Sequence, residues 1–222
     1  SMVVWVVAAS VLGFAISAIF AGWLKLSRQL FLVPYIILVS IFLYSFFVLN
    51  EIDLAEVLTE NWVWGIVVGG LVSIFLVKTV RSQPATRQLS GTALGFDIAW
   101  AGLVYGFIDA LFLNVMPVIT IWVGTSQLGW TETIAGKVGI GLIGLFASLL
   151  VTLTYHLGYP EFRNKSVGLV LVGNTLITLA FLLSGNPFGS IISHTAMHVA
   201  AVLQGPETTI QLPPHYQNYE RI

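Results

Sequence analysis

The sequence predicts an all-α fold, a polytopic bundle of about seven transmembrane helices. Hydrophobic residues make up 57% of the 222 residues and charged residues only 9%, whereas a soluble domain carries about 25% charged residues. The apolar runs have the length of a helix that crosses a bilayer, about 20 residues, and are twice as long as a barrel strand. The chain is therefore predicted to be an integral membrane protein, with one helical domain at 1–203 and a polar tail at 204–222.

Seven apolar segments follow one another along the chain. The expected spans cover residues 3–24, 30–49, 63–77, 92–123, 134–156, 167–183 and 186–203. The fourth is longer than one crossing needs and contains Pro117, so a helix that is broken, tilted or preceded by an interfacial turn is expected there. The last opens with Asn186 and Pro187, which form a helix-start signature.

The distribution of basic residues predicts the orientation. An extracytoplasmic N-terminus places the acidic loop at 51–60 outside and the tail in the cytoplasm. All basic residues except Lys137 then lie on the cytoplasmic side: Lys25, Arg28, Lys78, Arg81, Arg87, Arg163, Lys165 and Arg221. This asymmetry follows the positive-inside rule. We expect the chain to reside in the cytoplasmic membrane of a prokaryote.

Composition also excludes several classes of function. The net charge of -1 gives no reason to expect a nucleic-acid partner, and the absence of cysteine excludes disulfides and thiolate chemistry. The expected partners are membrane lipids and a hydrophobic peptide or lipid substrate.

Four ionisable residues in three predicted spans are the candidate site: Asp109, His156, His194 and His198. His194 and His198 are four residues apart and therefore share one helix face. Ionisable groups at membrane depth are costly and mark functional sites, so we expect Asp109 to face the bundle interior near the histidines. Three histidines and a carboxylate can bind zinc, which lowers the pKa of a bound water. Without metal, the same groups suit a general base, an oxyanion donor and the residues that orient them.

A structural alternative accounts for the same residues. His156 lies at a helix end, where an interfacial histidine is ordinary. His194 and His198 can donate hydrogen bonds to oxygen atoms of Ser193, Thr195 or Asn174. Asn174 itself is expected to hydrogen-bond between helices.

The order of these residues resembles that of the CAAX protease and bacteriocin-processing (CPBP) family of intramembrane proteases. That family carries Glu-Glu-x-x-x-Arg, Phe-x-x-x-His and His-x-x-x-Asn on successive helices. Residues 106–113, 152–156 and 194–198 are similar to these motifs in turn. The resemblance covers about residues 91–203. It implies a site in which Asp109 or a metal activates water, His156 acts as acid or base, and His194 and His198 bind a metal or the oxyanion.

Five positions depart from the family pattern. Ile108 and Asp109 stand where the family has its glutamates, Leu113 replaces the arginine, Thr152 the phenylalanine and His198 the asparagine. The leading hypothesis is therefore a CPBP-like, membrane-embedded hydrolase, either protease-like or zinc-assisted. The final His-x-x-x-His is also similar to that of the seven-span zinc hydrolases of the alkaline ceramidase and adiponectin-receptor group, whose carboxylate and first histidine come in another order. Two alternatives are a non-catalytic scaffold or ligand-binding protein, and a protein with haem between histidines on two helices.

Overall fold

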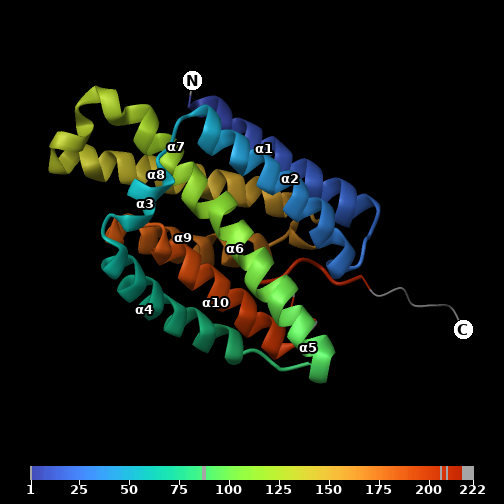
Figure 1. The fold of residues 1–222 in the computed structure, drawn as a ribbon. Coiled ribbons are helices and arrows are strands. Elements are labelled where there is room, and N and C mark those ends of the chain that lie inside the picture. Colours follow the sequence, from blue (N-terminus) through green and yellow to red (C-terminus); the bar gives the residue numbers. More distant parts are fainter. Residues whose placement is uncertain (1, 87–88, 206, 209, 217–222) are drawn as a thin grey trace, which may run out of the picture.

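The computed structural model describes residues 2–86, 89–205, 207–208 and 210–216, and these residues form helices without any strand (Figure 1). Six helical segments are long and apolar enough to cross a membrane, judged by length and composition. They are α1 (Val3–Ile16) with η1 (Ser17–Trp23), α2 (Arg28–Leu49), α4 (Trp62–Arg81), the run Gly91–Thr125, α8 (Ile134–Leu157) and α9 (Ser166–Ser184). The seventh long helix is α10 (Phe188–Gln204), with 17 residues. The predicted all-α transmembrane bundle is confirmed.

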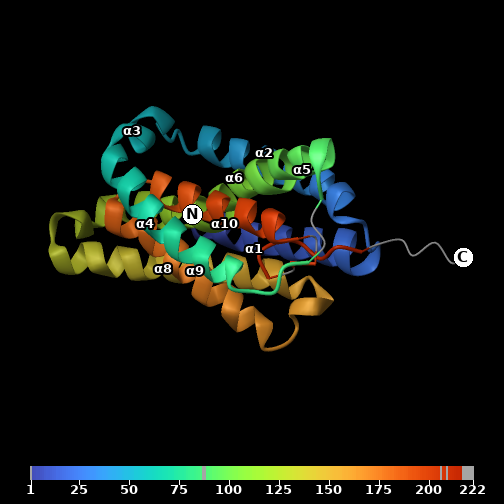
Figure 2. The ribbon, with the colours of Figure 1, turned by 90° about the horizontal axis from the view of Figure 1, so that it is seen from below.

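Helix α10 lies inside the bundle, where α4, α6, α9 and η2 pack around it (Figures 1 and 2). Close approach to α4 depends on Gly69, where a Cβ atom would lie 3.0 Å from the carbonyl oxygens of Phe188 and Gly189. Asn186 starts the helix as expected, because its Oδ1 accepts a hydrogen bond from the Phe188 N–H at 2.8 Å. This central position brings the α10 histidines against the run Gly91–Thr125, which carries Asp109 and Asn114.

The fourth span is one continuous helical run with two π-helical segments. It comprises α5 (Gly91–Asp97), η2 (Ile98–Val104), α6 (Tyr105–Ala110), η3 (Leu111–Val115) and α7 (Met116–Thr125). The helix is not broken at Pro117. That residue has no N–H to donate to the carbonyl of Leu113, and the Ser148 hydroxyl of α8 donates to this oxygen instead, at 2.6 Å. The π segments flank the short helix that carries Asp109.

The loops gather at two ends of the bundle. One end, here called the basic end, holds residues 24–27, 82–86, 158–165 and the described tail. The other, here called the acidic end, holds Met2, residues 50–61, 126–133 and 185–187 (Figure 1). Hydrogen bonds connect loops within each end: Asn186 Nδ2 donates to the carbonyl of Glu60 at 2.6 Å, and the Thr86 N–H donates to that of Gln204 at 3.0 Å. This alternation agrees with seven crossings. The orientation in a membrane stays a prediction, and Arg87 and Arg221 lie outside the described residues.

The tail is folded against the basic end. Arg28 is buried and binds it, with Nε donating to the carbonyl of Pro213 at 2.6 Å and Nη2 to that of Thr208 at 2.9 Å. Leu212 is only 3% exposed. The sequence did not indicate this contact, because a polar, proline-containing segment carries no signal for the surface on which it docks. The remaining short elements are α3 (Leu54–Thr59), η4 (Ser126–Leu128), η5 (Trp130–Glu132) and η6 (Pro160–Phe162).

Candidate metal centre

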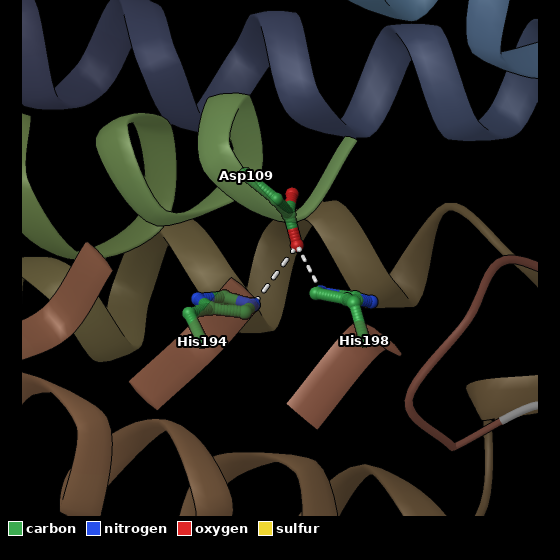
Figure 3. Close-up of side chains that lie close together, drawn as sticks. All are labelled: Asp109, His194 and His198. Carbon is green, nitrogen blue, oxygen red and sulfur yellow. Dashed lines mark ion pairs between the residues drawn. The ribbon is translucent and has the colours of Figure 1, made fainter. Parts of the chain in front are cut away.

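Asp109 of α6 faces His194 and His198 of α10 inside the bundle (Figure 3). The Oδ2 atom of Asp109 lies 3.2 Å from His194 Nε2 and 3.5 Å from His198 Nε2. All three residues are at most 3% exposed. The prediction that Asp109 faces the interior beside the histidines is confirmed. Among the described residues, these three form a group in which one ligand atom from each lies within 4.8 Å of the others.

Two glycines, one in α6 and one in η2, allow the fourth span to approach α10 at this level. A Cβ atom on Gly106 would lie 3.0 Å from the Thr195 Cα and 3.2 Å from the His198 Cβ. On Gly102, one turn earlier, a Cβ atom would lie 3.0 Å from Val199. Small residues spaced by four bring helix backbones together in membranes. Asp109 follows Gly106 by three residues, so this contact places the carboxylate over the histidines.

The hydrogen bond to Asn114 determines where His194 carries its proton. Asn114 Nδ2 donates to Asn174 Oδ1 at 2.7 Å and to Thr178 Oγ1 at 2.9 Å, which leaves Asn114 Oδ1 as an acceptor. His194 Nδ1 lies 2.7 Å from this oxygen and must therefore be the donor. In a neutral His194, Nε2 then has a lone pair directed at Asp109.

The polar chain continues from Asn114 into α8 and α9. Asn174 Nδ2 donates to Ser148 Oγ at 2.9 Å, and the hydroxyls of Ser148 and Thr178 are 2.9 Å apart. All of these groups are buried. Asn174 therefore hydrogen-bonds between helices, as expected. The network holds Asn114 in place, and Asn114 in turn orients the His194 ring.

His198 has an unusual environment for a buried histidine. Its ring stacks on that of His194, with centroids 4.8 Å apart and an angle of 10° between planes. Neither Nδ1 nor Nε2 has a hydrogen-bond partner among the described residues, although both are buried. The 3.5 Å separation from Asp109 is close enough for an ion pair but does not meet hydrogen-bond geometry. A buried, unpaired nitrogen is costly unless something else occupies its lone pair.

Tyrosines surround the carboxylate on the other side. The hydroxyl of Tyr35, from α2, donates a short hydrogen bond to Asp109 Oδ1. Tyr159 OH donates to Tyr155 OH at 2.5 Å, and Tyr155 OH lies 3.0 Å from Tyr105 OH. Sequence reasoning missed these residues. Tyr105 precedes Asp109 by one helical turn, which is a detectable signal, but Tyr35 lies in an ordinary apolar helix.

His156 is placed near the group but is not part of it. Its Nδ1 lies 2.8 Å from the carbonyl of Thr152, which can only accept, so Nδ1 carries the proton and Nε2 keeps its lone pair. The three-residue ligand group does not include His156. The residue lines the same cavity as the group.

That cavity has a volume of about 250 Å³ and extends from the centre toward the basic end. Its inner part is lined by Tyr105, Asp109, Thr152, His156, His194 and His198. The hydroxyl of Thr152 is also buried without a partner among the described residues. Several unpaired polar atoms therefore border a space that is otherwise lined mainly by apolar side chains.

Comparison with known proteins found no matching family model, no similar curated protein and no similar solved structure.

Proposed function

We propose that the chain is a membrane-embedded hydrolase in which Asp109, His194 and His198 hold a zinc ion. The observation that carries the proposal is that lone pairs of His194 and Asp109 point at each other. His194 Nε2 and Asp109 Oδ2 face each other at 3.2 Å, and the His194 proton is engaged by Asn114 on the opposite side of the ring. Two acceptors repel at this distance unless a cation or an extra proton lies between them. His198 adds Nε2, a third nitrogen, which has no hydrogen-bond partner among the described residues.

The spacing of the ligand atoms supports a metal. Zinc binds histidine nitrogen and carboxylate oxygen at about 2.0–2.2 Å in tetrahedral geometry, which separates two ligands by about 3.4 Å. The two separations from Asp109 Oδ2, 3.2 and 3.5 Å, bracket this value. Asn114 provides the outer hydrogen bond that orients a metal-binding histidine. Two histidines and one carboxylate form a recognised ligand set of catalytic zinc sites, which keep a fourth position open.

The chemistry of the neighbouring residues favours hydrolysis. Bound zinc supplies an acidified water and polarises a carbonyl group. His156 is suited to accept a proton from water and return it to the leaving group, because its Nε2 retains a lone pair beside the cavity. Tyr105 and Tyr155 also line the cavity, and the hydrogen bond between their hydroxyls leaves one of the two protons free to be donated to a developing oxyanion.

The CPBP-like order of motifs is compatible with a shared cavity for Asp109, His156, His194 and His198. An Asp/His/His group with a final His-x-x-x-His is chemically closer to the seven-span zinc hydrolases. We favour zinc-assisted chemistry over a glutamate-type protease, since Ile108 and Leu113 occupy the places of the CPBP glutamate and arginine.

The first test is metal content. We expect the full chain, purified in detergent and supplied with zinc, to retain about one equivalent after desalting, as a three-ligand site should. Elemental analysis should show that His194→Ala, His198→Ala and Asp109→Asn lose it. His156→Ala is the matched control, because it removes a histidine from the same cavity but outside the ligand group, and it should keep the metal.

Two results would contradict the metal site: no retained zinc in the native chain, or equal zinc in the native chain and His198→Ala. Asp109 and His194 would then share a proton, and the group would be a metal-free acid–base site or a structural contact. Haem held between two helices needs histidines from both, whereas the two histidines of the ligand group come from one face of α10. A haem absorption band in the visible spectrum would refute the zinc assignment directly.

Hydrolysis is tested separately, with liposomes that contain ester- and amide-linked lipids in 18O-labelled water. Mass spectrometry should find the label in a released carboxylate. Zinc-loaded His156→Ala should lose about 10²–10⁴-fold in rate, the range for removal of a general acid–base group. A metal-bound chain that releases nothing from such lipids or from apolar peptides would favour the binding-protein alternative.

A further inference from the structure

The site cavity reaches the lipid-facing side of the bundle between α4 and α9. Its outer walls include Phe75 of α4 and Leu169 and Val172 of α9, which are 57%, 62% and 63% exposed. These positions belong to helices that are long and apolar enough to cross the membrane, so their exposed surface faces lipid. Gly173 also lines the cavity, and a Cβ atom there would meet nothing within 4 Å. The α9 wall thus borders open space.

At the basic end, the tail forms the floor of this cavity. Residues 210–213 line it, and Leu212 is buried against the core. The two hydrogen bonds from Arg28 to Thr208 and Pro213 hold the segment on both sides of that leucine. The folded tail therefore separates the cavity from water while the side between α4 and α9 stays open.

The size and walls of the cavity favour a lipid chain over a peptide. Its volume of about 250 Å³ is below the ~300–1,000 Å³ of pockets that enclose a whole drug-sized ligand, so it takes one end of a longer molecule. A helical peptide is about 10–12 Å wide. An extended peptide needs hydrogen-bond partners for its backbone at membrane depth, and the side chains of Phe75, Leu169 and Val172 at the lipid-facing opening offer none. A hydrocarbon chain has no such need.

We propose that the substrate is a lipid, and that one apolar chain from the leaflet at the basic end enters the cavity sideways between α4 and α9. Transfer of a chain from bilayer to apolar cavity exchanges one hydrocarbon environment for another, so it requires little energy. The polar bond of the lipid would then reach Asp109, His194 and His198 with the tail still docked. This assignment of substrate class rests on the proposed hydrolase function, but the entry of the chain can be tested without activity.

The test uses photo-crosslinking in nanodiscs. The full chain is reconstituted with phosphatidylcholine that carries a diazirine at the end of one acyl chain, and adducts are mapped by mass spectrometry. We expect adducts inside the cavity, at Met197, as well as on the walls at Phe75 and Leu169. Gly173→Trp should fill the cavity and lower the Met197 adduct about tenfold, which corresponds to about 1.4 kcal/mol of chain binding.

Gly168→Trp is the matched control. Gly168 lies on the same helix and also has nothing within 4 Å of a Cβ atom, but it does not line the cavity. It should leave the Met197 adduct unchanged. Thermal unfolding of both variants checks that they are folded, and Gly173→Leu provides a smaller block of the same path.

The outcomes separate this inference from the proposed function. Adducts confined to the outer surface, or a Met197 adduct equal in folded Gly173→Trp and Gly168→Trp, would overturn the lipid route. Stronger Met197 labelling by a diazirine-bearing transmembrane peptide would overturn the choice of a lipid in favour of a peptide. Zinc is measured on the same samples: cavity adducts in a chain without zinc would support the route while contradicting the metal site.

Discussion

A single amide, that of Asn114, determines the hydrogen-bond direction through the candidate site. Because its Nδ2 is used by Asn174 and Thr178, its oxygen must accept from His194. The imidazole is then held with Nε2 toward Asp109. A mispositioned amide here would change the tautomer of the histidine, although Asn114 itself does not belong to the ligand group.

Replacing Asn114 should therefore weaken metal binding without removing a ligand. We expect Asn114→Leu to reduce zinc affinity about 10–100-fold, the usual effect of losing the hydrogen bond behind a metal-bound histidine. Competition against a chromophoric chelator measures this. Thr178→Val is the control: it removes a partner of Asn114 without contacting His194, so it should affect stability more than affinity. Equal affinities for the native chain and Asn114→Leu would show that the amide does not orient the ligand.

The run Gly91–Thr125 positions Asp109 through its local helix geometry. The π segments η2 and η3 flank α6, and π-bulges are frequent at functional sites. Gly102 and Gly106 bring this part of the run against α10, while Ser148 satisfies the Leu113 carbonyl that Pro117 leaves free. The helix therefore continues past the proline with its backbone groups paired.

A side chain at Gly106 should separate α6 from α10. Its Cβ atom would lie 3.0 Å from the Cα atom of Thr195, and backbone cannot move aside as a flexible side chain can. We expect Gly106→Val to destabilise the fold by about 1–3 kcal/mol, as overpacking does, and to weaken zinc binding. Thermal unfolding in detergent and the chelator titration measure the two effects. Gly95→Val, in the same run but with nothing within 4 Å, should change neither.

Seven alternating helices gather the basic loops and the tail at one end of the molecule. The Arg28 guanidinium donates hydrogen bonds to two carbonyl oxygens of the tail, which would otherwise bind water. Tyr216 OH donates a further hydrogen bond to Glu161 Oε1 at 2.6 Å. His215 lies between these contacts along the tail. Partial burial lowers its pKa below the usual value, and the positive charge of Arg28 lowers it further, while Asp97 opposes the shift.

Tail docking should therefore weaken in acid. A free tail has a His215 pKa near 6.5, whereas the docked tail binds the proton less readily. The free energy of tail docking does not change with pH above about pH 6.5. Below that pH docking becomes weaker, because His215 binds a proton more readily in the free tail and protonation therefore favours release. A spin label at Glu207→Cys, an exposed tail position in a chain without cysteine, should become more mobile as the pH is lowered from about 6.5 to about 5.5.

Two variants test the origin of this release. His215→Gln should remove the pH dependence of label mobility, and Arg28→Gln should release the tail at every pH. An acid-dependent change that persists in His215→Gln would assign the titration to another group.

The class of protein and most helix boundaries followed from local sequence. Apolar runs and flanking charges are properties of contiguous segments, so the spans at 134–156 and 167–183 correspond closely to α8 and α9. The cost of burying a carboxylate in hydrocarbon was also enough to place Asp109 beside His194 and His198.

Packing between distant segments determined the rest. Tyr35 lies 74 positions from Asp109, and Asn114 lies 80 positions from His194, so no local pattern could pair them. The same holds for the tail, which binds Arg28 across 185 positions. Whether His156 joined the ligand group depended on the rotation of α8, and its Nδ1 instead donates to Thr152 within that helix. Hydrophobicity determines that a helix crosses the membrane, but interhelical contacts determine which of its side chains meet.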